Sequence, residues 1–151
     1  MKDPKLRKDA QEIINASLKA VDPTVAVKKH VGLEGEILRV GDRRYKLDEY
    51  AHLYVVGCGK AAASMAYALE DLLQDRIDGG FINVKYGYTK DLNIIKRSEA
   101  GHPIPDEAGV RGTKEILTLL HGLGANDLVI FVMSGGGSAL LPLPQDGISL
   151  E

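Results

Sequence analysis

Hydrophobic residues recur at two different spacings in the first third of the chain. Over Pro4 to Ala20 apolar side chains return every three or four residues, which predicts an amphipathic helix with Pro4 in its first turn. From Val25 to Leu47 apolar and polar residues alternate instead, and Gly41-Asp42 separates two such runs. This part is predicted to be a small antiparallel hairpin at one edge of the molecule.

Beyond residue 50, short apolar runs alternate with segments of helical period. Strands are predicted over residues 53–56, 81–85, 94–97 and 128–133, and helices over 60–74 and after Asp106, which can cap the second helix. Strands that alternate with helices predict an α/β fold, with a mostly parallel sheet flanked by helices. Residues 147–151 read as the start of another helix with Ser149 as its N-cap, so the chain is interpreted as an N-terminal fragment of a longer protein.

Composition narrows the class of protein but not its function. The chain has 151 residues, 44% hydrophobic and 26% charged, as in one ordinary globular domain. A net charge of −2 gives no basic field for nucleic acid or an anionic membrane surface. The apolar runs are shorter than the roughly 20 residues that span a bilayer, and Met1-Lys2-Asp3 begins no secretory signal. With one cysteine, Cys58, no internal disulfide can form, and the cytoplasm is the expected compartment.

A glycine-rich segment directly follows the apolar run Leu128–Met133. It reads Ser134-Gly135-Gly136-Gly137-Ser138. Glycines at the end of a buried strand let the backbone turn sharply and present N–H groups to an anion, and the two hydroxyls add donors. We predict a cradle for a phosphate or carboxylate here; the alternative is a flexible loop without a ligand.

A second candidate loop joins the first parallel strand to its helix. Gly57 and Gly59 free the backbone, and Lys60 is predicted to lie in the first helical turn. A cation is disfavoured there by the helix dipole unless a bound anion offsets the cost. Lys60 therefore indicates an anion site, although a side chain that merely points to solvent is the alternative.

The second loop does not by itself say which anion is bound. It lacks the spacing of a Walker A loop, but Gly57, Gly59 and Ala62 fit the looser dinucleotide fingerprint. A dinucleotide site also needs an acidic residue at the end of the second strand, where this chain has Lys85. That residue weakens the case for NAD and leaves a 2′-phosphate on Lys85 as a speculative option.

The third candidate segment is Gly101–Asp106. Two prolines stiffen it, and His102 stands at its start, where it can donate to a carboxylate or phosphate or serve only to fix the loop. The remaining histidines and the cysteine are predicted to be structural: His30, His52, His121 and Cys58. No spacing of His, Cys, Asp and Glu predicts a zinc or calcium site, so metal ligands stay unknown.

Taken together and in this order, the three segments resemble the glycerate 2-kinase family. The matching stretches are residues 55–63 with Met65-Ala66, residues 101–109, and residues 133–142 with 147–150. The resemblance spans nearly the whole chain and is strongest from Tyr54 onward. Cys58 departs from the pattern, where a small residue such as alanine is usual, and everything after Glu151 is absent.

The resemblance implies a fold and an activity. Residues 1–151 would form the Rossmann-like N-terminal domain of a two-domain enzyme that uses ATP and Mg²⁺ to convert D-glycerate into 2-phosphoglycerate. Lys60 would stabilise charge on the transferred group, and His102 would contact substrate. The backbone and hydroxyls of Gly57, Gly59, Ser134, Gly135, Gly136, Gly137 and Ser138 would bind phosphate or carboxylate. Which loop takes ATP, and whether the protein is a homo-oligomer, stays open, and residues 1–151 alone are expected to be inactive.

Two other functions fit parts of the same pattern. An NAD(P)-dependent hydroxypyruvate reductase would use the fingerprint of Gly57, Gly59 and Ala62. A non-catalytic sugar-phosphate-binding domain is the other, because a strand followed by Gly-x-Gly-Lys and an alanine-rich helix also resembles sugar isomerase domains. Tight binding of NADH would favour the first, and selective binding of a sugar phosphate without a response to ATP would favour the second.

Overall fold

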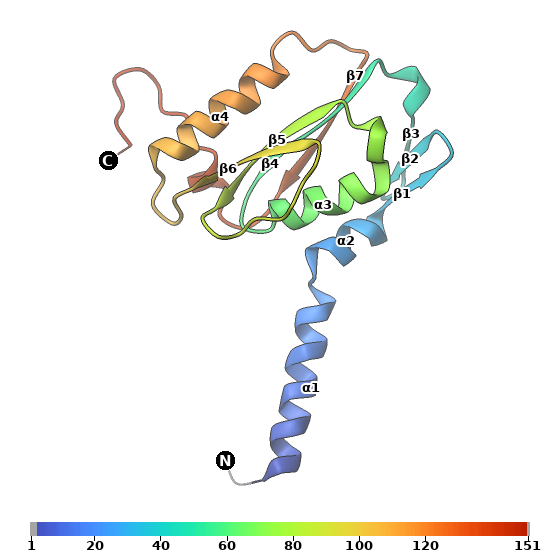
Figure 1. Ribbon diagram of the computed structural model, residues 1–151, viewed down its shortest axis with the longest axis vertical. Coiled ribbons are helices and arrows are strands. Elements are labelled where there is room, and N and C mark those ends of the chain that lie inside the picture. Colours follow the sequence, from blue (N-terminus) through green and yellow to red (C-terminus); the bar gives the residue numbers. More distant parts are fainter. Residues whose placement is uncertain (1–2, 151) are drawn as a thin grey trace.

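The computed structural model describes residues 3–150, in which one long helix precedes two sheets and their covering helices (Figure 1). The long helix is α1 (Pro4–Ala20), as predicted. Asp3 caps it by accepting a hydrogen bond from the Lys5 amide at 2.9 Å. None of its residues is buried, and the helix projects away from the rest of the molecule (Figure 1).

A small antiparallel sheet follows, in the order β1-β2-β3. Its strands are β1 (Val31–Glu34), β2 (Ile37–Val40) and β3 (Arg43–Lys46). The predicted turn at Gly41 lies between β2 and β3 and has a φ of +59°. The predicted hairpin is therefore present and gains a third strand.

The prediction of extended structure from Val25 onward is wrong over residues 25–30, which belong to α2 (Pro23–His30). Asp22 caps this helix by accepting from the Val25 amide at 3.0 Å, and Pro23 occupies the first turn, where its fixed φ suits a helix. The helix-start signal of Asp22 and Pro23 is stronger than the strand-like alternation of Val25 and Val27.

The main sheet has four parallel strands in the order β6-β5-β4-β7. They are β4 (His52–Cys58), β5 (Gly79–Lys85), β6 (Ile95–Ala100) and β7 (Asp127–Met133). All four predicted strands are present with slightly different ends. The chain runs outward from β4 to β5 and β6 and then returns to the other side of β4, so the order reverses between β4 and β7. In open α/β sheets such a switch point opens a crevice at the carboxyl ends of the strands.

The helices cover opposite faces of the main sheet, which confirms the predicted α/β fold (Figure 1). α3 (Ala62–Leu73) connects β4 to β5, and α4 (Glu107–Leu120) connects β6 to β7. The two connections run in opposite directions across the sheet, so right-handed crossovers place them on opposite faces. Asp106 caps α4 as predicted, and a short helix, α5 (Gly137–Leu140), follows β7.

The main core lies between the sheet and α3. Residues with at most 4% exposure from three strands meet small side chains of the helix there: Leu53, Val55, Ile82, Val84 and Val132 on the strands, with Ala62, Ala63 and Ala66 on α3. The alanines let the helix approach the sheet closely. In the part of the chain that is described, no helix is both long and apolar enough to cross a membrane.

Two predicted boundaries need correction. α3 begins at Ala62, so Lys60 lies in the turn before the helix and not in its first helical turn. Within 147–150 the structure has a turn at Gly147 and no helix, and the expected continuation at Glu151 lies outside the described residues.

Candidate anion-binding site at the carboxyl ends of β4 and β7

Three loops that the sequence singled out converge at one edge of the main sheet. They are the β4–α3 loop with Lys60, the β7–α5 loop with Gly135 and Gly136, and the β6–α4 loop with His102. Parallel strands end at the same edge, so loops far apart in the sequence become neighbours. The site is built at the switch point between β4 and β7.

The β4–α3 and β7–α5 loops are tied to each other by main-chain amides. The Lys60 amide donates to the carbonyl of Gly135 at 3.0 Å, and the Ala61 amide donates to Ser134 Oγ at 2.9 Å. In return, the Ser134 amide donates to the carbonyl of Cys58 at 3.1 Å. The two loops therefore form one hydrogen-bonded unit.

Gly57 and Gly59 make this close approach possible. A Cβ on Gly57 would lie 2.0 Å from the carbonyl oxygen of Val132, and one on Gly59 would lie 2.2 Å from Ser134 Oγ. Gly59 also has a φ of +124°, which a residue with a side chain rarely adopts. These glycines give room for the neighbouring strand and loop.

The amides of the β4–α3 loop are already engaged within the protein. Besides the bonds of Lys60 and Ala61, the Gly59 amide donates to the carbonyl of Asn83 at 3.0 Å. In this loop the lysine side chain is therefore more available to an anion than the main-chain amides are. Binding of a phosphate or carboxylate by Gly57 and Gly59 stays a prediction.

The β7–α5 loop provides the open donors. Among the described residues, the amides of Gly135, Gly136, Gly137 and Ser138 have no hydrogen-bond acceptor. Gly135 and Ser138 are exposed, and Gly136 has a φ of +93°. Lys60 lies beside them, with its Cε 3.8 Å from the point where a Cβ on Gly135 would be. Successive free amides next to an exposed ammonium form an arrangement that binds an anion.

His102 is brought to the same loop. A Cβ on Gly136 would lie 2.6 Å from His102 Cδ2 and 2.7 Å from its Nε2, so the imidazole packs against the backbone of Gly136. The ring is half-buried and reaches the side of the cradle. The structure thus brings Lys60, Ser134–Ser138 and His102 together at one edge of the sheet.

The loop that carries His102 is closed by Asp106. Its carboxylate accepts hydrogen bonds from the Gly109 amide at 3.0 Å and from the Tyr86 hydroxyl at 2.8 Å. Burial by itself raises the pKa of Asp106, but hydrogen bonds from the backbone of Gly101, Gly109 and Ala108 and from Tyr86 together hold this pKa below its usual value. The same hydrogen bond to Asp106 is the main cause that raises the pKa of Tyr86.

Sequence reasoning missed Asn83, which lies fully buried in β5. Its main-chain carbonyl accepts a hydrogen bond from the Gly59 amide. Its side-chain Nδ2 donates to the main-chain carbonyl of Gly109, in the first turn of α4, at 3.1 Å. Asn83 therefore connects the β4–α3 loop to the helix that follows the His102 loop. An asparagine inside the apolar run of residues 81–84 was the available signal.

The residues predicted to be structural lie as expected for such a role. Cys58 is 1% exposed and packs beside Leu140, and burial raises the pKa of its thiol, so it fills space. His52 Nδ1 lies 2.8 Å from Asp127 Oδ1 at the amino ends of β4 and β7, far along the sheet from the loops described above. His30 ends α2, and His121 follows α4.

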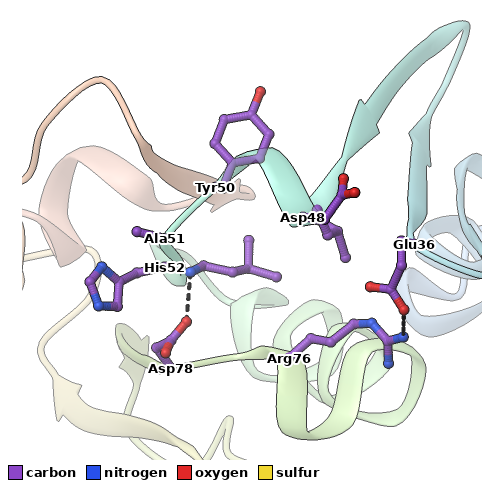
Figure 2. A pocket seen from close by; sticks show the side chains of 9 residues that line it. Glu36, Asp48, Tyr50, Ala51, His52, Arg76 and Asp78 are labelled. Atoms are coloured by element: carbon purple, nitrogen blue, oxygen red, sulfur yellow. Dashed lines mark hydrogen bonds and ion pairs between the residues drawn. The ribbon is translucent and has the colours of Figure 1, made fainter.

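A hollow lies at the amino ends of the strands, between the two sheets (Figure 2). Three of its charged groups have partners: Arg76 pairs with Glu36 at 2.5 Å, and Asp78 accepts from the Leu53 amide at 2.8 Å. The Arg76–Glu36 pair joins the β1–β2 turn of the small sheet to the segment between α3 and β5. Over residues 3–150 no group of three His, Cys, Asp or Glu side chains could hold a metal ion.

The sequence matches a family described as Domain of unknown function (DUF4147) over residues 9–151. The chain belongs to this family. One relative, the glycerate 2-kinase of Pyrococcus horikoshii, is 42% identical over 146 residues, which is 97% of this chain and 32% of the relative. Another, named a putative hydroxypyruvate reductase of Agrobacterium vitis, is 31% identical over 148 residues, 98% of this chain and 31% of the relative.

Two solved structures have the same fold as this DUF4147 chain. A protein from Pyrococcus horikoshii OT3 superposes with a TM-score of 0.83 at 41% identity, over 99% of this chain and 34% of its own. The glycerate kinase of Thermotoga maritima superposes with a TM-score of 0.76 at 35% identity, over 98% of this chain and 33% of its own. The chain thus spans about a third of the length of the relatives it matches.

Proposed function

We propose that this chain is the N-terminal α/β part of a two-domain glycerate kinase, which transfers the γ-phosphoryl group of ATP to D-glycerate. The oxygen of the 2-hydroxyl bonds to the γ-phosphorus, the bond from that phosphorus to the bridging oxygen of ADP breaks, and the hydroxyl proton leaves. 2-Phosphoglycerate and ADP are the products. The observation that carries the proposal is the row of open amides from Gly135 to Ser138 beside the Lys60 ammonium.

The residues of this chain hold and orient charge in that reaction. Phosphoryl transfer requires alignment and electrostatic stabilisation more than covalent participation of the protein. Lys60 is the positive charge next to the moving group, the amides of Gly135–Ser138 bind a phosphate or the glycerate carboxylate, and His102 donates to substrate from the side. Gly57 and Gly59 keep Lys60 beside Gly135, because they let the β4–α3 loop pack closely against β7 and the β7–α5 loop.

ATP and Mg²⁺ are proposed as cosubstrate and cofactor, with different support from the structure. The open amides and Lys60 fit a phosphate. The described residues offer no group of acidic side chains for a metal ion, so we assign none of them to Mg²⁺ and derive no step through it. D-glycerate and ATP are the proposed small-molecule partners, and the cytoplasm is the proposed compartment. The proposal is compatible with a homo-oligomer.

The alternatives have less support. A hydroxypyruvate reductase would bind a dinucleotide pyrophosphate on the amides of the β4–α3 loop, but those of Gly59, Lys60 and Ala61 are engaged by protein acceptors. Lys85 also stands where an acidic ribose ligand would be needed. One relative is named a putative hydroxypyruvate reductase, which is a reason to test this activity as well. A sugar-phosphate-binding domain would use the same open amides without turnover.

The direct test measures ADP release by the full-length gene product with D-glycerate, L-glycerate and hydroxypyruvate, together with NADH oxidation. We expect ATP-dependent turnover of D-glycerate and no NADH oxidation. NADH-dependent turnover of hydroxypyruvate would replace the kinase proposal by the reductase. The 151-residue chain alone is expected to be inactive in the same assay, because two-domain kinases place the reacting groups in the cleft between domains.

The role of Lys60 is tested in the same assay with Lys60→Ala and Lys60→Met. We expect kcat to fall by about 100-fold or more, because one preorganised charge is lost where charge develops. Lys60 is exposed, so the free energy of unfolding should change by less than about 0.5 kcal/mol. Lys29→Ala in α2, also exposed, is the matched control and should leave kcat unchanged. Near-normal turnover of both Lys60 variants would refute the role.

A further inference from the structure

β7 has two apolar faces, of which only one is covered in the described chain. Leu128, Ile130 and Val132 point toward α3 and belong to the main core. The alternate residues point to the other face and are exposed: Val129 37%, Phe131 48% and Met133 67%. On that face α4 packs over β5 and β6, so it leaves the β7 side without a helix.

β7 is also the end strand of the sheet, and it lacks the features that protect end strands. Within the described residues it pairs with β4 alone. Natural edge strands are kept short or carry charges, prolines or bulges that prevent further pairing. β7 has seven residues, of which Asp127 alone is charged and none is proline. A continuous apolar run of this kind is typical of a strand inside a parallel sheet, with neighbours on both sides.

The handedness of the fold says which face a further crossover would cover. The connection from β6 to β7 runs across the sheet toward the β7 edge and carries α4 on one face. Crossovers between parallel strands are right-handed in nearly all proteins, so successive crossovers in the same direction place their helices on the same face. A crossover from β7 to a strand beyond it would therefore place its helix on the α4 face. That is the face on which Val129, Phe131 and Met133 are exposed.

We infer that β7 is an interior strand in the full-length protein and that polypeptide following residue 151 covers it. That polypeptide supplies a helix over Val129, Phe131 and Met133 and a parallel strand beside β7. The matched relatives are about three times as long as this chain, which provides the necessary length. The inference rests on topology and family membership and is independent of the reaction proposed above.

The first test is oxidation of methionines by hydrogen peroxide, read by mass spectrometry in the 151-residue chain and in the full-length gene product. Met133 is exposed in the chain, and its thioether should be oxidised readily. In the full-length product we expect its oxidation to slow by about tenfold or more, because oxidation follows exposure. Met65, half-buried beside the α3 core, is the internal control and should react equally in both.

A charge placed at the amino end of the same face gives a second test. Val129→Lys should be harmless in the 151-residue chain. In the full-length product it should lower the melting temperature by about 5 °C or more, because a lysine would be buried without a partner. Val40→Lys in β2 is the matched control, since Val40 is a strand valine with 38% exposure, against 37% for Val129.

Two results would overturn the inference. Equal oxidation of Met133 in both proteins would show that the face stays open when the rest of the polypeptide is present, or that no further polypeptide exists. Sedimentation of the 151-residue chain as a dimer, with protection of Met133 that Val129→Lys removes, would show that a second copy covers β7.

Discussion

Gly136 is a residue at which the candidate site tolerates little change. Its φ of +93° strains any other residue, and a Cβ would meet the His102 ring at 2.6 Å. Gly35 has a similar backbone strain at φ +61° but open space around the position of its Cβ. The two glycines therefore separate the cost of backbone conformation from the cost of contact with His102.

We expect Gly136→Ala and Gly35→Ala to share a backbone penalty of about 1–2 kcal/mol in the free energy of unfolding. Gly136→Ala should also displace His102 and lower the affinity for D-glycerate in the full-length protein, whereas Gly35→Ala should leave that affinity unchanged. Urea unfolding and KM measurements check both parts. An unchanged KM in Gly136→Ala would remove His102 from the site.

Asp106 makes the loop of His102 sensitive to acid. Its pKa in the folded chain is below the ordinary value of 3.8, so its stabilising contribution is complete above that value and is lost as the pH falls through the folded pKa. We expect Asp106→Asn, which keeps an N-cap but removes the charge, to melt at a lower temperature than wild type at pH 7. The difference should shrink as the pH falls below 3.8 and through the folded pKa, and a difference that is constant with pH would contradict this assignment.

At the scale of residues, the sequence singled out side chains and loops that the fold brings together, but not the hydrogen bonds that their amides make. Lys60, His102 and Ser134–Ser138 do come together, because each follows a strand of one parallel sheet. That the amides of Gly59 and Ala61 would be used by the protein could not be predicted, since their acceptors lie 24 and 73 residues away in the sequence. Such pairings depend on the way the loops pack.

At the scale of elements, α4 is held against β5 by a tight contact at the site of a buried amide. A Cβ on Gly112 would lie within 1.8 Å of Asn83 Oδ1, so the helix can approach only because residue 112 is glycine. Asn83 in turn connects this helix to Gly59. The position of α4, and of the loop before it, depends on this pair.

The pair predicts an unusual sign for a helix substitution. Gly→Ala inside a helix usually stabilises by about 0.5–1 kcal/mol. We expect Gly112→Ala to destabilise by about 1–3 kcal/mol, because the new methyl group overpacks the contact with Asn83. Combining it with Asn83→Ala should recover part of the loss, as a double-mutant cycle by urea unfolding would show. Strictly additive effects would contradict the contact.

The elements that the sequence predicted correctly are a long periodic helix, the apolar strands of the main sheet and a capped helix start. α1, the four strands of the main sheet and the capped start of α4 are all present. α2 was misread because only two valines carried the alternation, while Asp22 and Pro23 gave the stronger signal for a helix start. The third strand of the small sheet was missed because each strand has only four residues.

At the scale of the whole molecule, the site lies where the fold itself changes direction. The open amides follow β7, the lysine follows β4, and the strand order reverses between them. The same strand, β7, has an uncovered face and edge. The candidate anion site and the proposed position for further polypeptide are therefore adjacent.

The central claim is that the amides of Gly135–Ser138, supported by Lys60, gather anionic oxygens. The most direct measurement is a ¹H–¹⁵N NMR titration of the 151-residue chain with ATP and with D-glycerate. We expect the shifts to concentrate on those four amides, to leave the Gly124 amide at the other end of the sheet unmoved, and to weaken about tenfold in affinity in Lys60→Met. If these amides stay unmoved at millimolar ligand, or if Lys60→Met binds like wild type, the claim is contradicted.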